Sequence, residues 1–582
     1  MKRFLLVVLA FIGFMTIAGF IAAVMLLIVG VTAIGKISVP ATAVLEIDFQ
    51  QPFIETLPAD PIARFFQADQ IELRALIDAI DRAGEDGKIV ALHADVSGVG
   101  LGLAQIQEVR SAIERFRASG KPAIAFAETF GEMSPGNAAY YLATSFDRIY
   151  LQPSGDCNLV GFHLEHPFLR GTFDKLGIVP RFGQRYEYKN AANLYTETSF
   201  TDAHREASAS LLGSLSTQLT TAVSETRGID AARLQELIDI APLDGAESLA
   251  AGLVDGLLYR DQLEDSLRAE LGADLEGVTL DDYIDRHRDR PFGSKGGNIA
   301  LVYGYGTVSR GSSSADVGGE PVMGSSTVGS ALRDALEDDQ VDAIVFRVSS
   351  PGGSYVASDA IWRETIRIRE AGKPLVVSMG DYAASGGYFV SMAADHIVAD
   401  PATLTGSIGV FGGKLVMGGL AEKLGVSFDE LSTGAHASIF SPMRDYSESE
   451  WIEVNSWLDR VYADFTQKVA DAREMPVERV REIARGRVWT GQDAYDLGLV
   501  DELGDMETAI TRAAELAGLE GGDYSVRVYP EPKSTWELIM ERRAFRSASL
   551  QLRELRALIA GVRPFAHLLD QPDALETPRV EP

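Results

Sequence analysis

The sequence has 582 residues, roughly four times the ~150-residue size at which single domains are commonest, so we expect two or more domains. Its 46% hydrophobic and 23% charged residues exclude a disordered chain and a protein that crosses a membrane many times. The 53 Lys and Arg against 83 Asp and Glu give a net charge of −30, which repels phosphate backbones and argues against nucleic acid as a partner.

An uncharged apolar run opens the chain. Residues 4–35 carry no charge, and the run is longer than the ~20 residues that a helix needs to cross a bilayer. A cleaved signal sequence would have a shorter apolar region. Lys2 and Arg3 precede the run and favour a cytoplasmic N-terminus. We therefore predict a retained transmembrane anchor over residues 1–36 that contacts the lipid bilayer, with the body of the protein on the other side, which in a bacterium is the periplasm.

Strand and helix patterns alternate after the anchor. Apolar strand patterns occur at residues 41–49 and 299–308. Buried strand runs such as AIVFRV, residues 343–348, are followed by amphipathic helix patterns such as residues 358–372. This alternation predicts an α/β fold. The stretch RDRPFGSKGG, residues 288–297, has no period and is rich in Gly, Pro and charge, which favours a linker.

The chain contains two repeats of one domain. Residues 120–153 have the same sequence pattern as residues 372–401. Residues 176–191 align with residues 424–439 without a gap, at an offset of 248. Further on, GAESLAAGLVD matches GQDAYDLGLVD. Three matches in the same order indicate an internal duplication. We predict a first repeat over residues 37–290, a second over residues 291–530, and a helical segment with an acidic tail over residues 531–582.

A glycine-rich turn follows the strand run at residues 343–348. In SSPGGS, Gly352 and Gly353 come after a proline that fixes the turn. Their backbone N–H groups can face an incoming oxygen with no Cβ in the way, as an oxyanion hole requires. The alternative is an ordinary strand-to-helix turn in which Ser354 caps the next helix.

A second small-residue motif places a serine at the start of an apolar helix pattern. In GDYAASGGYFVSMAA, the helix N-terminus after Ser385 favours negative charge that develops beside its hydroxyl. Gly386 and Gly387 let a substrate backbone come close. Ser385 is therefore a candidate nucleophile, and a helix N-cap serine is the alternative. Ala383 stands where a GxSxG elbow has its first glycine, which weakens an α/β-hydrolase interpretation.

A serine hydroxyl needs a base to take its proton, and one lysine is a candidate. In the repeat alignment Ser385 pairs with Asn137 of the first repeat, whereas Lys189 pairs with Ala437 of the second. Each repeat therefore keeps one half of a possible dyad. Lys189 has apolar and aromatic neighbours in RYEYKNAANLY, where burial would lower its pKa towards neutrality, as a general base requires. An exposed, solvated lysine is the alternative.

Other catalytic groups are scarce in the sequence. None of the eight histidines stands in an HExxH motif and no GxxxxGK[ST] loop occurs, which argues against a zinc protease and a P-loop ATPase. His396 lies in a strand-like run typical of a core histidine, while His436 stays open as a base. The single cysteine, Cys157, cannot form an intrachain disulfide or a multi-cysteine zinc site. We expect no metal and no other cofactor.

Taken together, these motifs resemble the long form of the signal peptide peptidase A family, also called protease IV, whose members are membrane-anchored bacterial serine proteases. The resemblance rests on MGDYAASGGY with TLTGSIGVFGG, on RVSSPGGS and YKNAAN, and on the tandem repeats, from the anchor to about residue 530. It implies a Clp protease/crotonase fold, an α/β superhelix of ββα units, in each repeat. SSPGG stands where relatives often have NSPGG, and YKNA where many have YKSA.

The resemblance also implies roles for individual residues. They are Ser385 as nucleophile, Lys189 as general base, Ser407 as the group that orients the lysine amine, and Gly352, Gly353 and Gly386 as the oxyanion hole. It implies a membrane-bound endopeptidase that degrades cleaved signal peptides, which are extended and apolar, through an acyl-enzyme. It further implies a homotetramer on the periplasmic face of the inner membrane.

Two other functions compete with this interpretation. A crotonase-like acyl-CoA enzyme would share the fold and an oxyanion hole but would lack a Ser–Lys pair and a membrane anchor. A catalytically silent membrane-anchored scaffold would use Ser385 only as a helix cap and Lys189 only as a surface charge. Hydrolysis of an apolar peptide ester by the wild type, compared with Ser385→Ala and Lys189→Met, would distinguish a protease from both.

Overall fold

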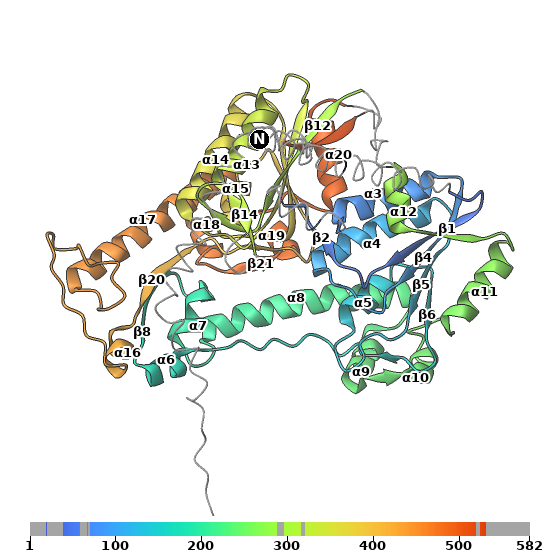
Figure 1. Ribbon diagram of the computed structural model, residues 1–582, viewed down its shortest axis with the longest axis horizontal. Coiled ribbons are helices and arrows are strands. Elements are labelled where there is room, and N and C mark those ends of the chain that lie inside the picture. The colour runs from blue at the N-terminus through green and yellow to red at the C-terminus, as the bar shows by residue number, and fades with distance from the viewer. Residues whose placement is uncertain are drawn as a thin grey trace, which may run out of the picture.

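The computed structural model describes residues 39–58, 70–287, 296–315, 320–519 and 524–530, together with the single positions 19 and 67 (Figure 1). Apart from position 19, the predicted anchor over residues 1–36 lies outside the described residues, as do most of the predicted linker and the whole C-terminal segment from residue 531. In the part of the chain that is described, no helix has both the length and the apolar character needed to span a membrane.

The first repeat is built on a six-stranded parallel sheet with the order β10-β6-β5-β4-β1-β11. Its strands are β1 (Ala43–Asp48), β4 (Ile89–Asp95), β5 (Ala123–Ala127), β6 (Arg148–Leu151), β10 (Gly256–Leu257) and β11 (Glu276–Thr279). All five residues of β5 are buried, as expected for a parallel strand that is covered on both faces.

The second repeat contains an eight-stranded sheet. Its strands are β12 (Asn298–Tyr305), β16 (Ala343–Ser350), β17 (Leu375–Ala384), β18 (His396–Ala399), β19 (Leu404–Gly406), β21 (Val488–Thr490), β22 (Glu502–Leu503) and β23 (Ser525–Tyr529). The run β22-β18-β17-β16-β12-β23 has the same order as the whole first sheet and is parallel throughout. The shared order agrees with the predicted duplication, whereas the domain boundaries given above stay predictions.

Helices cover both faces of each sheet (Figure 1). In the first repeat they are α3 (Leu73–Glu85), α4 (Leu103–Ala118), α5 (Asn137–Ala143), α6 (Arg170–Leu176), η1 (Asn190–Ala192), α7 (Asn193–Thr196), α8 (Asp202–Arg227), α9 (Ala231–Ile240), α10 (Gly245–Ala250), α11 (Arg260–Leu271) and α12 (Leu280–His287). In the second they are α13 (Ser325–Glu337), α14 (Tyr355–Glu370), α15 (Gly386–Ser391), α16 (Gly418–Lys423), α17 (Glu448–Ala472), α18 (Val477–Ile483), α19 (Gly491–Asp496) and α20 (Met506–Leu516).

The shorter strands form small sheets at the periphery. They are β2 (Phe53–Ile54), β3 (Ile71–Glu72), β7 (Asp156–Cys157), β8 (Val179–Arg185), β9 (Leu243–Asp244), β13 (Thr307–Ser309), β14 (Ser314–Ala315), β15 (Pro321–Gly324) and β20 (Val410–Val416). One of these sheets joins the two repeats, because β8 of the first pairs antiparallel with β20 of the second. Sequence segments more than 200 residues apart therefore form one ribbon at the lower left of Figure 1.

Buried polar contacts hold the repeats together near the end of β17. Arg347 on β16 is 1% exposed and pairs with Glu55 and Glu108 of the first repeat, each at 2.6 Å. Asp381 on β17 accepts hydrogen bonds from the backbone N–H groups of Ala104 and Gln105, both at 3.2 Å, and so caps α4 from the other repeat. The strand that leads to Ser385 is thus fixed to the first repeat.

Candidate active site

Ser385 lies at the turn from β17 into α15. Its φ of +55° is uncommon for a residue with a side chain, and such conformations concentrate at functional sites. Ser385 occupies the N-cap position of α15, but its side chain accepts no capping hydrogen bond. Ser354, in contrast, caps α14 by accepting from Ala357 N. The N-cap interpretation is therefore right for Ser354 and leaves the Ser385 hydroxyl available for another partner.

The partner of the Ser385 hydroxyl is Lys189, from the turn after β8 of the first repeat. Lys189 Nζ lies 3.0 Å from Ser385 Oγ. The same nitrogen lies 2.7 Å from the carbonyl oxygen of Ser407 and 2.8 Å from Ser407 Oγ. The structure thus brings together the three side chains that the motifs singled out, from two repeats and from positions up to 218 residues apart.

Burial determines the protonation state of Lys189. The residue is only 5% exposed, and burial lowers the pKa of its amine to about 7. No charged neighbour contributes to this shift. The alternative of an exposed, solvated lysine is wrong for this position.

The second repeat positions the backbone of Lys189. The N–H groups of Tyr186 and Tyr188 donate to the carbonyl oxygen of Arg485, at 3.0 and 3.2 Å. Gly486 has a φ of +84°, and a Cβ on it would lie 2.5 Å from Lys189 Cβ. Only a glycine therefore lets the lysine turn come this close. Nothing in the sequence pattern pointed to Gly486.

Replacing Gly486 with alanine is expected to displace Lys189 and lower kcat by about 10²-fold, the typical cost of a misplacement of about 1 Å at a reacting group. The matched control is Gly372→Ala, because Gly372 has a similar φ of +76° but open space at its Cβ. The control carries the same backbone strain without a contact to Lys189. Steady-state kinetics on a peptide ester check this, and equal losses in the two variants would contradict the steric explanation.

The glycine turn after β16 rests directly on Ser385. Gly352 has a φ of +103°, and a Cβ on it would lie 2.8 Å from Ser385 Cβ. Its N–H donates to Ser350 Oγ at 3.2 Å. The N–H groups of Gly353 and Gly386 donate to no described residue. A Cβ on Gly386 would lie 3.1 Å from Gly353 N, so these two free donors are close neighbours beside the serine.

Arg487 links Ser407 to the first repeat, and no motif in the sequence pointed to it. Its carbonyl oxygen accepts from Ser407 N at 2.7 Å, which fixes the backbone that holds the lysine amine. Its side chain donates to Glu206 on α8 at 2.7 Å. Glu206 also accepts from the Tyr188 hydroxyl at 2.5 Å, next to Lys189.

The two candidate histidines, His396 and His436, contact residues other than Ser385. His396 Nε2 is 2.9 Å from Glu502 Oε2, and His436 Nε2 is 3.1 Å from Ser449 Oγ. Ser385 is therefore in contact with the lysine and with neither histidine. Cys157 is buried, which raises the pKa of its thiol to about 12 and keeps it unreactive. Among the described residues, no group of His, Cys, Asp or Glu side chains is arranged to hold a metal ion.

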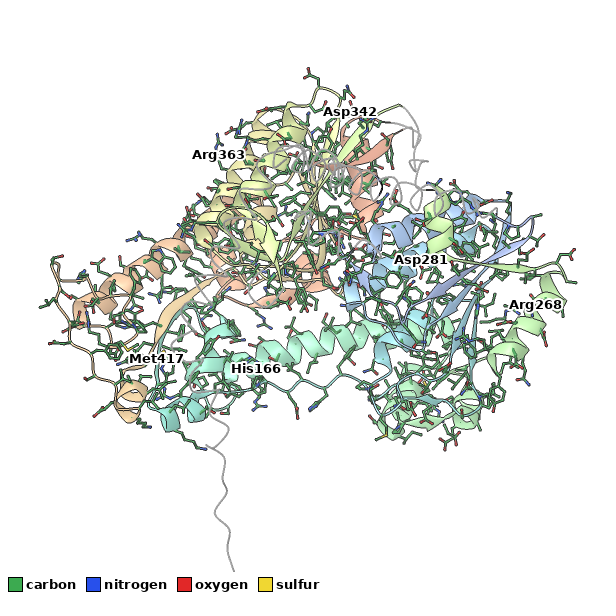
Figure 2. All side chains as sticks on the ribbon, viewed as in Figure 1. His166, Arg268, Asp281, Asp342, Arg363 and Met417 are labelled. Atoms are coloured by element: carbon green, nitrogen blue, oxygen red, sulfur yellow. The ribbon has the colours of Figure 1, made fainter. Side chains whose placement is uncertain are left out.

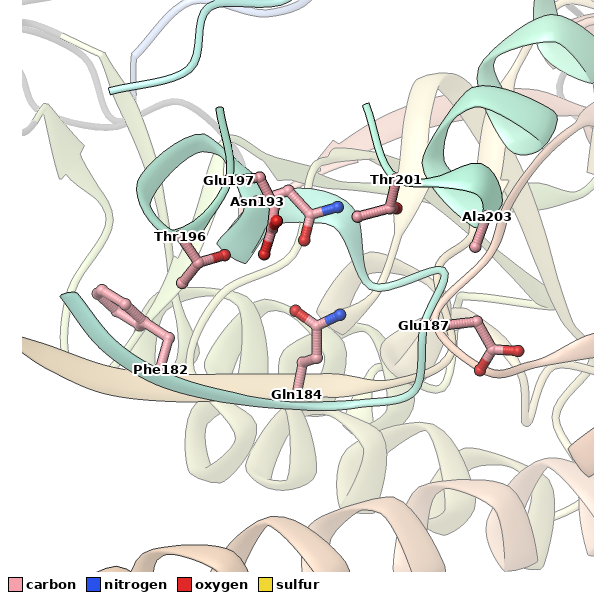
Figure 3. A pocket seen from close by; sticks show the side chains of 8 residues that line it. All are labelled: Phe182, Gln184, Glu187, Asn193, Thr196, Glu197, Thr201 and Ala203. Atoms are coloured by element: carbon pink, nitrogen blue, oxygen red, sulfur yellow. The ribbon is translucent and has the colours of Figure 1, made fainter. Parts of the chain in front are cut away.

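A cavity of about 330 Å³ lies between β8 and the segment from α7 to the start of α8 (Figure 3). Its walls are Phe182, Gln184, Glu187, Asn193, Thr196, Glu197, Thr201 and Ala203. Most of these side chains are polar and two are carboxylates. This cavity does not supply the apolar surface that an apolar peptide needs.

A serine hydroxyl within hydrogen-bond distance of a buried, near-neutral amine and beside free backbone donors is typical of serine hydrolases. The model of Peptidase family S49 matches residues 115–274 and 367–520, one match in each repeat. The chain belongs to peptidase family S49, and it is a serine peptidase.

Relatives match most of the chain. "Protease 4" of Salmonella typhi is 34% identical over 495 residues, which cover 81% of this chain and 77% of that protein. "Protease 4" of Haemophilus influenzae is 34% identical over 461 residues, with 76% and 72% covered. "Serine protease SPPA, chloroplastic" of Arabidopsis thaliana is 30% identical over 458 residues, with 77% and 66% covered. The motifs' resemblance to the signal peptide peptidase A family is confirmed by these matches.

Among solved structures, a mutant of ClpP1 from Listeria monocytogenes matches 35% of this chain and 91% of that chain, at 15% identity and a TM-score of 0.21. A score this low carries no argument about the fold. The α/β class and the tandem arrangement rest instead on the two sheets and on the two family matches.

Proposed function

We propose that the chain is an endopeptidase that degrades cleaved signal peptides with a catalytic dyad of Ser385 and Lys189. The observation that carries the proposal is the 3.0 Å contact between Lys189 Nζ and Ser385 Oγ, made by a lysine whose pKa is lowered to about 7. About half of such a lysine is unprotonated at neutral pH and able to accept a proton. A lysine with its ordinary pKa near 10.5 would be protonated almost entirely.

The surroundings of Lys189 suit a neutral amine. A neutral amine has two N–H donors and one lone pair, and three oxygens surround the nitrogen. In the neutral form the two oxygens of Ser407 accept the two N–H groups, and the lone pair accepts from the Ser385 hydroxyl. In the charged form the third N–H donates to Ser385 Oγ. We assign Ser407 as the positioning residue on this ground. A crotonase-like acyl-CoA enzyme or a silent scaffold would need no such arrangement.

Peptide hydrolysis then proceeds in two halves. Lys189 takes the Ser385 proton while Oγ forms a bond to the peptide carbonyl carbon. The free N–H groups of Gly353 and Gly386 donate to the oxyanion, and Gly352 holds this turn against the serine. The C–N bond breaks, Lys189 returns its proton to the leaving amine, and an acyl-enzyme remains.

Water completes the reaction by the same groups. Lys189 takes a proton from the water as its oxygen attacks the ester carbon, and the oxyanion forms again beside the same donors. The bond to Ser385 Oγ breaks, Oγ recovers the proton from Lys189, and the second product leaves as a carboxylic acid that ionises. No further reactant is needed.

The pH dependence of the reaction tests the proposal. Activity requires unprotonated Lys189, so kcat/KM should rise with pH through about 7 and then level off. A lysine at its ordinary pKa would place this rise above pH 10. The measurement is hydrolysis of an uncharged peptide ester between pH 5 and 9. A flat profile over this range would contradict a titrating lysine base.

Exposed aromatic side chains near the dyad support apolar, extended substrates. Tyr382 precedes Ser385 by three residues and is 49% exposed. Tyr186 stands three residues before Lys189, and Phe411 four residues after Ser407, and both are also exposed. Apolar side chains at these places would contact the residues flanking a scissile bond. Signal-sequence-like peptides should be cleaved faster than charged peptides of equal length, and equal rates would contradict this preference.

We also propose that residues 1–36 anchor a homotetramer to the bacterial inner membrane, with its N-terminus cytoplasmic and its catalytic body periplasmic. The uncharged apolar run and the preceding Lys2 and Arg3 support this topology. The repeated parallel strand and helix units support a Clp protease/crotonase-type fold in both repeats. The full chain should sediment with membranes, and a chain starting at residue 37 should not.

A further inference from the structure

The polar cavity between β8 and the start of α8 takes no part in the mechanism. Its volume of about 330 Å³ is at the lower end of the range for small-molecule sites, so it has room for a single side chain. Its wall includes Glu187, two residues before Lys189, and Cα atoms two positions apart are separated by at most ~7 Å. A group bound in the cavity would therefore lie close to a peptide held at the dyad.

The two carboxylates of the cavity differ in their partners. Glu187 forms an ion pair with Arg485, which compensates its charge. Glu197, the residue after α7, contacts no cation and no side-chain hydrogen-bond donor among the described residues. Arg205, at the start of α8, lies over the ring of Phe200, 5.3 Å from its centroid. The cavity therefore has one negative charge that no described cation compensates.

Asn193 directs a buried oxygen into the cavity. The residue is 3% exposed, and its amide nitrogen lies 3.4 Å from His204 Nδ1. Burial, together with His166, lowers the pKa of His204 to about 4; His166 is labelled in Figure 2, and the two ring centroids are 4.8 Å apart. A ring that is neutral at pH 7 can accept from the Asn193 amide nitrogen, which turns the amide oxygen towards the cavity. There this oxygen accepts from no described residue.

Two more side chains present oxygens to the same space. Gln184 Nε2 donates to the carbonyl oxygen of Tyr186 at 3.3 Å, and the Thr196 hydroxyl donates to that of Ala192 at 3.2 Å. These bonds engage the donors and leave Gln184 Oε1 and the Thr196 lone pairs for a ligand. In Figure 3 the Gln184 side chain rises from β8 towards Glu197 on the opposite wall. The polar lining is thus rich in acceptors, which suits a ligand that only donates hydrogen bonds.

The rest of the wall is apolar. It consists of Ala203 and the ring of Phe182, which stacks on Tyr195 with the ring centroids 5.1 Å apart. Lysine and arginine join a methylene stem, which packs on such surfaces, to a positively charged head that donates hydrogen bonds and accepts none. An anion would be repelled by Glu197, and an apolar side chain would leave the acceptors without donors. The lining therefore fits a basic side chain.

We propose that this cavity is a subsite for a lysine or arginine side chain of the peptide substrate. The inference rests on the proposed function, because signal peptides carry a positively charged segment next to their apolar one. Phe411, exposed near the dyad, pairs with Gln184 in the ribbon of β8 and β20, so the two side chains share one face. The apolar segment would lie along this face, and the basic side chain would enter the cavity between Gln184, Asn193 and Glu197.

Peptides that differ in a single charge test the subsite. An apolar fluorogenic peptide with a mapped cleavage site receives one lysine, at each position from about two to about six residues on either side of the scissile bond. Each peptide is compared with its Nε-acetyl-lysine counterpart, which keeps the stem and removes the charge. The full-length wild-type chain should favour the lysine peptide about 3- to 10-fold in kcat/KM, at one or two adjacent positions only. No preference at any position, or an equal one at all positions, would overturn the proposal.

Carboxylate variants separate the cavity from the acidic surface as a whole. Glu197→Gln should bring the ratio of the two kcat/KM values close to 1, and Glu197→Lys should reverse it in favour of a peptide with glutamate at that position. Glu225→Gln is the matched control, because Glu225 is exposed at the far end of α8, about 30 Å from Ala203. It removes the same charge and should keep the wild-type ratio. Equal ratios in Glu197→Gln and Glu225→Gln would overturn the proposal.

The same peptides distinguish a failure of the subsite from a failure of the proposed function. Hydrolysis that is lost in Ser385→Ala but shows no preference for lysine in the wild type would overturn the subsite alone. Hydrolysis that persists in Ser385→Ala would contradict the proposed function itself, and the subsite with it.

Discussion

Replacing Ser385 with alanine is expected to lower kcat by roughly 10⁴- to 10⁶-fold, the range seen when a serine nucleophile is removed. The variant loses the oxygen that forms the acyl-enzyme, while the N–H groups of Gly353 and Gly386 stay in place. The fold should be unchanged, because the Ser385 side chain accepts no capping hydrogen bond and alanine differs only by the hydroxyl.

The measurement combines hydrolysis of an apolar peptide ester with labelling by a fluorophosphonate. The wild-type chain should bind one label at Ser385, and Ser385→Ala should bind none. Ser354→Ala is the matched control, because Ser354 is a serine at a helix N-cap that does accept a capping bond. That variant should lose about 1 kcal/mol of stability and keep its labelling. A Ser385→Ala variant that loses stability but keeps its activity would contradict the assignment of Ser385 as the nucleophile.

Ser354 and Ser385 show what a sequence can and cannot predict about a serine before a helix. Both serines precede helix patterns, so the sequence offers the helix N-cap interpretation for each of them. The strand pattern and the helix pattern on either side of SSPGGS predicted a turn in which Ser354 caps the next helix, and α14 begins at Tyr355, directly after it. What separates Ser385 is a φ of +55° and an amine at 3.0 Å, and both depend on contacts with residues far away in the chain.

The repeat alignment contributed most to the prediction of the dyad. It showed that each repeat keeps one candidate group, which is meaningful only if the repeats touch. The way in which the repeats touch could not be predicted. It depends on close contacts between repeats, and no repeating sequence pattern marks the residues that make them, which are Gly486, Arg487 and Asp381 as the cap of α4. Local patterns report on a strand or helix, whereas such contacts depend on tertiary packing.

The aligned segments at residues 176–191 and 424–439 show a further limit. Their alignment predicts equal structures, yet the first contains β8 and the second is irregular over residues 427–433. A strand forms when a neighbouring strand satisfies its backbone N–H and C=O groups. Among the described residues, β8 has β20 as such a neighbour and residues 427–433 have none, so aligned sequences take different local structures.

Replacing Lys189 with methionine should reduce activity about as far as Ser385→Ala does. Methionine has a similar length, is uncharged and suits a buried site, so the fold should be kept while the base is lost. Lys189→Arg should be equally inactive, because a guanidinium stays protonated and cannot take a proton. Together the two variants separate a need for a base from a need for a positive charge.

Two comparisons make the result decisive. Lys373 is a matched control, because its amine donates to the carbonyl oxygens of Ala335, Leu336 and Asp338 and lies away from Ser385. Lys373→Met should lower the unfolding temperature and leave kcat/KM unchanged. The double variant Ser385→Ala with Lys189→Met should be no slower than either single variant, since a nucleophile and its base act as one unit. Additive losses in the double variant would mean that Lys189 acts on some step other than activation of Ser385.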